Sequence, residues 1–156
     1  MASPASIGKH PLHPMLVGFP IALWIFSFVC DLVYAFDWGG AIWHEMAFYT
    51  MAGGVIGALA AAVPGYIDFR SITDETTQRI GKTHMLLNLT LVGIFIVDLV
   101  LRWRNPASVT LPALLSAVGI LVLGVSGWWG AELVYVRGMG VEPQATKSSE
   151  PRRRVV

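Results

Sequence analysis

Four long apolar stretches alternate with short polar segments along this chain. Each stretch approaches the roughly 20 residues that a helix needs to cross the hydrocarbon core of a bilayer. The pattern therefore predicts an all-α membrane protein, an antiparallel four-helix transmembrane bundle that occupies residues 10–141. The four stretches are Leu16–Tyr34, Ala47–Ile67, Met85–Leu101 and Leu111–Val136.

The segments outside the predicted bundle are short and polar. Residues 1–9 are expected to be a mobile N-terminus and residues 142–156 a disordered basic tail, since neither has the apolar side chains of a core. Hydrophobic residues make up 54% of the 156 residues and charged residues 13%, which places the chain in the membrane class. The net charge of +1 gives no electrostatic case for nucleic acid, so the first partner we expect is the lipid bilayer.

Lysine and arginine are distributed unevenly between the two ends of the predicted bundle. All but two of the 11 basic residues fall at the end that carries both chain termini, and the two exceptions are Arg102 and Arg104. The positive-inside rule then predicts a multi-pass protein whose N- and C-termini are both cytoplasmic.

The residues that flank the apolar stretches predict the helix boundaries. We expect the chain to stay extended until Pro14, because a residue that precedes proline avoids the α region. Thr73 is predicted to cap a helix that runs into the third stretch, and Ser108 or Thr110 to cap the fourth.

Several features predict how the helices pack. Asp98 and Arg102 are four residues apart, which suits an ion pair near the membrane interface. The second stretch has small residues at every fourth position, which permit close packing against a neighbouring helix. The minority alternatives are a homodimer interface and a flat cofactor against that face. No long internal repeat is evident, although two helix pairs could pack with similar geometry. The small residues are Gly53, Gly57, Ala61 and Gly65.

Side chains that can carry chemistry gather at one face of the predicted bundle. In four antiparallel spans, the starts of the first and third helices and the ends of the second and fourth lie at the same face. Ionisable side chains at a bilayer boundary are few, and they tend to carry function when they cluster. The side chains at this face are His10, His13, His84, Asp68, Glu132, Asn88 and Tyr135.

Imidazoles beside carboxylates suit a transition-metal ion such as Zn, Fe or Cu. We expect His13 and His84 to be the leading ligands. His10 is then a further ligand or a hydrogen-bonding neighbour, and Glu132 and Asp68 are carboxylate ligands or orienting groups. The sequence thus predicts a metal site at the cytoplasmic end of the bundle.

Other interpretations of the same side chains stay open. Haem b could be held by two axial histidines from different segments, with Asn88 and Tyr135 among the cofactor-binding residues. A quinone headgroup site would relay protons through a histidine and a carboxylate. In the non-catalytic alternative, the cluster is structural and satisfies loose backbone groups at the helix ends of a membrane subunit. Whether the protein catalyses a reaction is an open question at this stage.

Several short motifs resemble a bacterial membrane protein family. His10-Pro11-Leu12-His13-Pro14 with Phe19-Pro20 comes first, and Gly65-x-x-Asp68 and His84-x-x-x-Asn88 follow. Gly130-Ala131-Glu132-Leu133-Val134-Tyr135 then leads to Gly138-x-Gly140-Val141. From Lys9 to Val141 the chain is similar to the family known as domain of unknown function 2231.

The resemblance implies a four-helix protein of the bacterial inner (plasma) membrane with no settled activity. Relatives are sometimes joined to Rieske-type or cytochrome c modules, which implies redox work for the family. Redox partner proteins, or the quinone of the alternative above, would then be the electron partners. Together with the histidine and carboxylate cluster, the resemblance favours a metal- or haem-binding redox or electron-transfer component.

Overall fold

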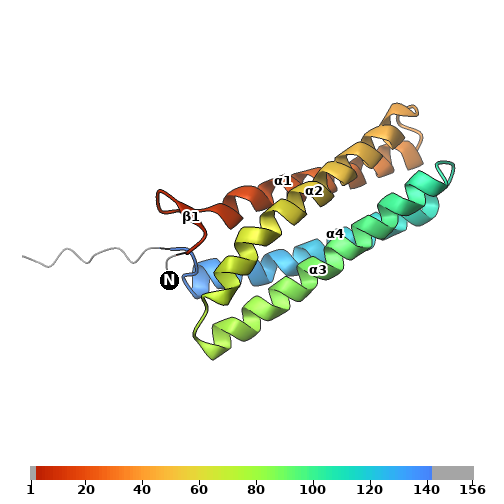
Figure 1. Ribbon diagram of the computed structural model, residues 1–156. Coiled ribbons are helices and arrows are strands. Elements are labelled where there is room, and N and C mark those ends of the chain that lie inside the picture. The colour runs from red at the N-terminus through yellow and green to blue at the C-terminus, as the bar shows by residue number, and fades with distance from the viewer. Residues whose placement is uncertain (1–2, 142–156) are drawn as a thin grey trace, which may run out of the picture.

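The computed structural model describes residues 3–141, which form an antiparallel bundle of four long helices (Figure 1). The helices are α1 (Leu12–Ala35), α2 (Ile42–Arg70), α3 (Glu75–Arg104) and α4 (Thr110–Ala131), and α4 continues into a π-helical turn, η1 (Glu132–Val136). Two short antiparallel strands, β1 (Ser6–Ile7) and β2 (His10–Pro11), precede α1. All four long helices are long and apolar enough to cross a membrane. The predicted fold class is therefore confirmed, while the predicted tail 142–156 lies outside the described residues.

The two ends of the bundle are distinguished by the segments that lie there (Figure 1). At the end that we call the termini end, α1 and α3 begin and α2 and α4 finish. At the opposite end, the loop end, segments 36–41 and 105–109 connect the helices. The β1–β2 hairpin lies at the termini end, where the carboxylate of Asp68 accepts hydrogen bonds from the Ser3 hydroxyl (2.6 Å) and the Ala5 N–H (3.2 Å).

The start of α1 differs from the prediction. The helix begins at Leu12, so His13 is helical and the chain does not stay extended until Pro14. A proline is tolerated in the first turn because its missing N–H would have no partner there. The N–H of Leu12 bonds to the carbonyl of Ala5 (2.9 Å), which fixes the entry of the chain into the helix.

Two predicted helix caps are also wrong. α3 is capped by Asp74 and not by Thr73, because the Asp74 carboxylate accepts a hydrogen bond from the N–H of Thr77 (2.8 Å). α4 follows Val109 as its N-cap residue, without a side-chain cap.

The small residues of α2 pack against α1, as predicted. A Cβ atom added at Gly53 would lie 3.2 Å from the Leu23 side chain, and one at Gly57 would lie 3.2 Å from the Pro20 ring. Helices in a membrane associate through van der Waals contact of this kind, because lipid tails are as apolar as the side chains they would replace. Large apolar side chains are meanwhile exposed on the outer surface of every helix, where they would contact lipid: Phe19, Tyr49, Leu89 and Leu121 are examples.

The hairpins α1–α2 and α3–α4 pack with similar geometry, as the sequence allowed, and they form a structural repeat with little residue identity. Arg102 follows Asp31 by 71 residues, and this offset superposes the buried positions of α3 on those of α1. Pro20, Trp24, Ser27 and Asp31 of α1 thus correspond to Leu91, Phe95, Asp98 and Arg102 of α3, all eight of them buried.

The second helices of the two hairpins repeat as well. A Cβ atom at Gly54 of α2 would lie 2.5 Å from the Trp24 ring, and one at Gly119 of α4 would lie 2.7 Å from the Phe95 ring. In each hairpin, an aromatic ring of the first helix therefore packs against a glycine of the second helix.

Equivalent residues of the two hairpins contact each other along the middle of the bundle. The rings of Trp24 and Phe95 stack with their centroids 4.4 Å apart in the core. Contact between equivalent positions marks a two-fold axis. Since α1 and α3 begin at the same end, this pseudo-two-fold axis runs along the bundle, as in membrane proteins built from parallel repeats.

Candidate functional site

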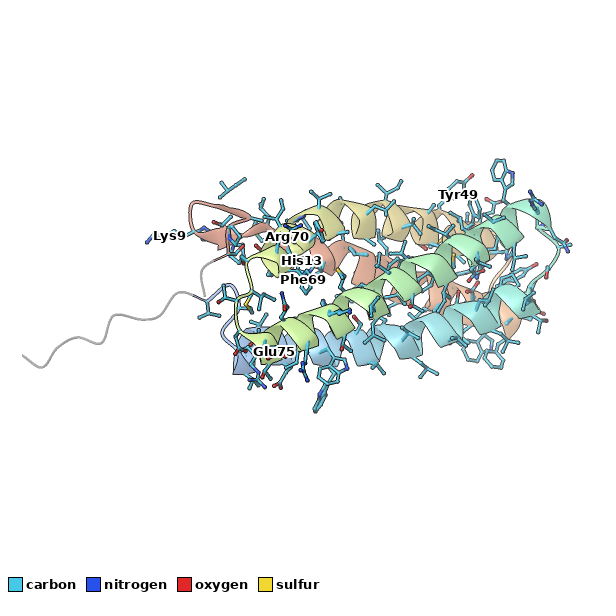
Figure 2. The ribbon with its side chains drawn as sticks, turned by 60° about the horizontal axis from the view of Figure 1, so that its bottom comes forward. Lys9, His13, Tyr49, Phe69, Arg70 and Glu75 are labelled. Atoms are coloured by element: carbon cyan, nitrogen blue, oxygen red, sulfur yellow. The ribbon has the colours of Figure 1, made fainter. Side chains whose placement is uncertain are left out.

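Two histidines occupy equivalent positions at the termini end. His13 lies in the first turn of α1, and His84 lies in α3 at the same offset that relates Asp31 to Arg102. Their ring centroids are 6.4 Å apart, and the ring planes are nearly perpendicular at 86°. Figure 2 shows His13 among the helices, at the same end of the bundle as Lys9 and Arg70. The structure therefore brings together the two leading predicted ligands, one from each hairpin.

Each imidazole is held by a backbone carbonyl of the second helix of its own hairpin. Nδ1 of His13 lies 2.8 Å from the carbonyl oxygen of Ala61 on α2, and Nδ1 of His84 lies 3.0 Å from that of Ser126 on α4. A carbonyl oxygen can only accept a hydrogen bond, so each Nδ1 carries the proton that it donates. In the neutral ring Nε2 is then the nitrogen with a lone pair, so it is the atom of each histidine that can accept a hydrogen bond or bind a ligand.

A glycine makes room for each imidazole. A Cβ atom at Gly65 would lie 2.7 Å from Nδ1 of His13, and one at Gly130 would lie 3.0 Å from Cε1 of His84. Real Cβ atoms rarely approach so closely, so a larger residue at either glycine would displace the ring. The space that the histidine rings need therefore explains the glycines of the Gly65-x-x-Asp68 and Gly130-Ala131-Glu132 motifs.

Asn88 is the third predicted site residue that the structure places at the pair. Its Nδ2 atom lies 2.8 Å from the backbone carbonyl oxygen of His84 and 3.1 Å from Nε2 of the same residue. Because the carbonyl accepts only, the atom next to it is the amide nitrogen, which has two hydrogens to donate.

The two predicted carboxylates have partners of their own. Asp68 accepts hydrogen bonds from Ser3 and Ala5, which precede β1, and Glu132 forms a 3.5 Å ion pair with Arg137 just after η1. Both residues lie at the termini end, but the contacts that the structure gives them are with these neighbours.

His10 and Tyr135 point outward. The ring of His10 in β2 is exposed and its Nδ1 bonds to the carbonyl of Gly8 (2.8 Å), and the Tyr135 side chain is 86% exposed. Among residues 3–141, no three His, Cys, Asp or Glu side chains stand close enough to hold one metal ion together. The close grouping at this end is therefore a pair of imidazoles with an amide.

A second polar cluster lies buried near the loop end. The predicted pair of Asp98 and Arg102 is confirmed, with a distance of 3.0 Å between Arg102 Nε and a carboxylate oxygen of Asp98. Sequence reasoning missed the other two members. Asp31 of α1 accepts two hydrogen bonds of 2.7 Å from Arg102, and the Ser116 hydroxyl of α4 donates to Asp98 (2.9 Å). The guanidinium of Arg102 on α3 is 2% exposed, and it joins α1 through Asp31 and α4 through a 3.1 Å hydrogen bond to the Ser116 hydroxyl.

A bundle of two repeated hairpins, with apolar spans throughout and paired imidazoles on its axis, defines a class of small polytopic membrane protein. The family described as Predicted membrane protein (DUF2231) matches residues 9–143, and the chain belongs to this family. The resemblance of its short motifs is therefore confirmed. Comparisons with curated proteins and with solved structures gave no significant match.

Proposed function

We propose that this protein binds a transition-metal ion (Zn, Fe or Cu) or a haem iron through His13 and His84. In this proposal it is a redox or electron-transfer component of the bacterial inner membrane, with its site at the cytoplasmic end. The observation that carries the proposal is the pairing of each Nδ1 with a backbone carbonyl. Histidines that ligate metals almost always donate their other ring N–H to such an acceptor, which fixes the tautomer and the ring orientation.

The spacing of the rings supports a shared ion. A metal–nitrogen bond of about 2.0 Å from each side places the centres of two opposed imidazoles about 6 Å apart. The observed separation of the ring centroids of His13 and His84 is 6.4 Å. One ion bound by Nε2 of both residues therefore requires little change in the separation of the two ring centroids.

The pseudo-symmetry also supports a single site on the axis. A ligand that binds there meets the same residue type from each hairpin, and each residue has the same carbonyl support and the same facing glycine. A purely structural role would require only that each polar ring find an acceptor.

Imidazole ligands suit iron and copper, which change oxidation state, and also zinc, which does not. The redox role rests on the first two metals or on haem, with redox partner proteins or quinone as electron partners. His10, Asp68 and Glu132 remain predicted as further ligands or orienting groups, and Tyr135 as a cofactor contact.

The test is the metal and haem content of the purified full-length protein. Elemental analysis and an absorption spectrum should show near-stoichiometric iron, copper or zinc, or the Soret band of a haem. Replacing His13 or His84 by alanine should lower occupancy by about 10-fold or more, because loss of a ligand exceeds loss of a supporting group.

His44→Ala is the matched control. This ring lies near the loop end, where it contacts Tyr34, so its loss should leave occupancy unchanged. Protein with neither metal nor haem, whose thermal stability does not respond to added metal, would contradict the proposal. That result would favour the non-catalytic membrane subunit.

A further inference from the structure

The surroundings of the two histidines differ at two equivalent positions. The hydroxyl of Ser126 lies 3.3 Å from Nδ1 of His84, whereas Ala61, the equivalent partner of His13, has no hydroxyl. The other difference lies on the first helix of each hairpin. One helical turn after His84 lies Asn88, and one turn after His13 lies Val17. Both positions are half-buried and occupy the same place in the repeat. The repeat therefore has a polar amide on one side of the axis and an apolar side chain on the other.

The side-chain amide of Asn88 is hydrogen-bonded to Nε2 of His84, the atom that is proposed to bind the ion. Nδ1 of His84 donates its hydrogen to the backbone carbonyl of Ser126, so Nε2 is the nitrogen with the lone pair. Asn88 Nδ2 donates a 3.1 Å hydrogen bond to that lone pair. An ion that binds this nitrogen must take the place of the donated hydrogen. The second hydrogen bond of Asn88, to the His84 carbonyl at 2.8 Å, does not involve the ligand atom and can persist. Val17 has no donor to offer to His13.

We infer that Asn88 is a gate on the metal site, one that occupies the ligand nitrogen of His84 and makes the two histidines bind in order. This inference rests on the proposed function. The incoming ion binds first to His13, whose neighbour Val17 does not compete. Nε2 of His84 then binds the same ion, after its hydrogen bond with the Asn88 amide has broken.

The gate also has a role in the empty site. It keeps Nε2 of His84 hydrogen-bonded while no ion is present, which avoids the cost of a buried acceptor without a partner. The same bond lowers the affinity for the ion, so the site can exchange its metal. Affinity is thus set by a residue that need not be a ligand.

The repeat supplies reciprocal variants that test the gate. Asn88→Val gives His84 the same neighbour that His13 has in the wild-type protein. Val17→Asn gives His13 an amide neighbour like that of His84. Full-length protein in detergent is titrated with Zn²⁺ against a chromophoric chelator, and the melting temperature without Zn²⁺ is recorded for each variant. Asn88→Ala provides a second, smaller side chain in case the branched valine disturbs the helix.

Asn88→Val and Asn88→Ala should bind Zn²⁺ more tightly by roughly 3- to 10-fold, the factor that corresponds to one hydrogen bond of ordinary net strength. Val17→Asn should bind it more weakly by a similar factor. Without Zn²⁺, the Asn88 variants should melt at a lower temperature because both amide bonds are lost. A merely structural asparagine would lower stability and affinity together.

Two failures are distinguishable. If His13→Ala and His84→Ala weaken Zn²⁺ binding but the Asn88 variants do not tighten it, the gate is refuted and the metal site stands. If neither histidine affects Zn²⁺ binding, the metal site itself is refuted, and the gate with it.

Discussion

The guanidinium of Arg102 donates two parallel hydrogen bonds of 2.7 Å to the carboxylate of Asp31, across 71 residues of sequence. The two residues are equivalent in the repeat, so the same position has opposite charge in the two hairpins. Asp98 adds a second carboxylate to the same guanidinium. Opposite charges at equivalent positions attract across the axis, and they join the hairpins near the loop end.

Removing the cation should cost more than removing either anion. Arg102→Leu leaves Asp31 and Asp98 buried without their partner, and breaking a buried ion pair in this way costs about 3–5 kcal/mol. Asp98→Asn keeps Arg102 paired with Asp31 and should cost less, about 1–3 kcal/mol. Unfolding in mixed detergent micelles measures both values, and equal stability of the two variants would show that the guanidinium does not hold the cluster together.

The glycines that face the histidines should be sensitive to a single methyl group. Gly65→Ala and Gly130→Ala place a Cβ atom 2.7 Å and 3.0 Å from the respective rings, so each ring must move away from its carbonyl. Zn²⁺ affinity should then fall by roughly 10-fold or more, because the ligand loses its orienting contact. Gly124→Ala is the control, since a Cβ atom there would meet nothing within 4 Å. Unchanged Zn²⁺ affinity in both site variants would show that the orientation of the two rings does not affect metal binding.

The start of α3 should be sensitive to acid through Asp74. Hydrogen bonds from the hydroxyl and the backbone N–H of Thr77 lower the pKa of the Asp74 carboxyl below its usual value. A group whose pKa is lower in the folded state stabilises the protein above its unfolded pKa, and this contribution is lost as pH falls through the folded value. The melting temperature should therefore drop below about pH 4, where an unfolded aspartate takes up its proton.

Asp74→Asn keeps an oxygen that can accept the capping hydrogen bond but does not titrate. Its melting temperature should fall less steeply with acid than that of the wild-type protein over the same pH range. Parallel curves for the two proteins would mean that Asp74 does not contribute to the acid sensitivity.

The orientation of the bundle is open to a direct test. The excess of lysine and arginine at the termini end predicts that this end faces the cytoplasm. A reporter fused after Gly140 should report the cytoplasm, and one inserted between Asp37 and Trp43 should report the other side. The reverse pattern would move the histidine pair to the opposite face of the membrane.

The helices were predictable because each apolar stretch contains its own signal in local hydropathy. The meeting of His13 with His84 also followed from the antiparallel order of the spans, which places their helix starts at one face. Boundaries were less certain, since Asp74 and Thr73 are both good capping residues and the geometry of the turn chooses between them.

The repeat could not be seen in the sequence because the hairpins share burial more than residue identity. Trp24 corresponds to Phe95, and Asp31 to Arg102, a residue of opposite charge. A contact across 71 residues leaves no local spacing to detect, so the partner of Arg102 on α1 was missed for the same reason. The carboxylates of Asp68 and Glu132 were placed at the correct end, but sequence could not indicate that Ser3 and Arg137 are their neighbours.

The most direct test counts the histidine ligands on the bound ion. Full-length protein loaded with an equimolar amount of Zn²⁺ is examined by X-ray absorption at the zinc edge. The proposed site predicts two imidazoles with zinc–nitrogen distances of about 2.0 Å in the wild-type protein. It predicts one imidazole after His13→Ala or His84→Ala, and two after His44→Ala. A spectrum without imidazole, or one that neither His13→Ala nor His84→Ala changes, would contradict the paired-histidine site.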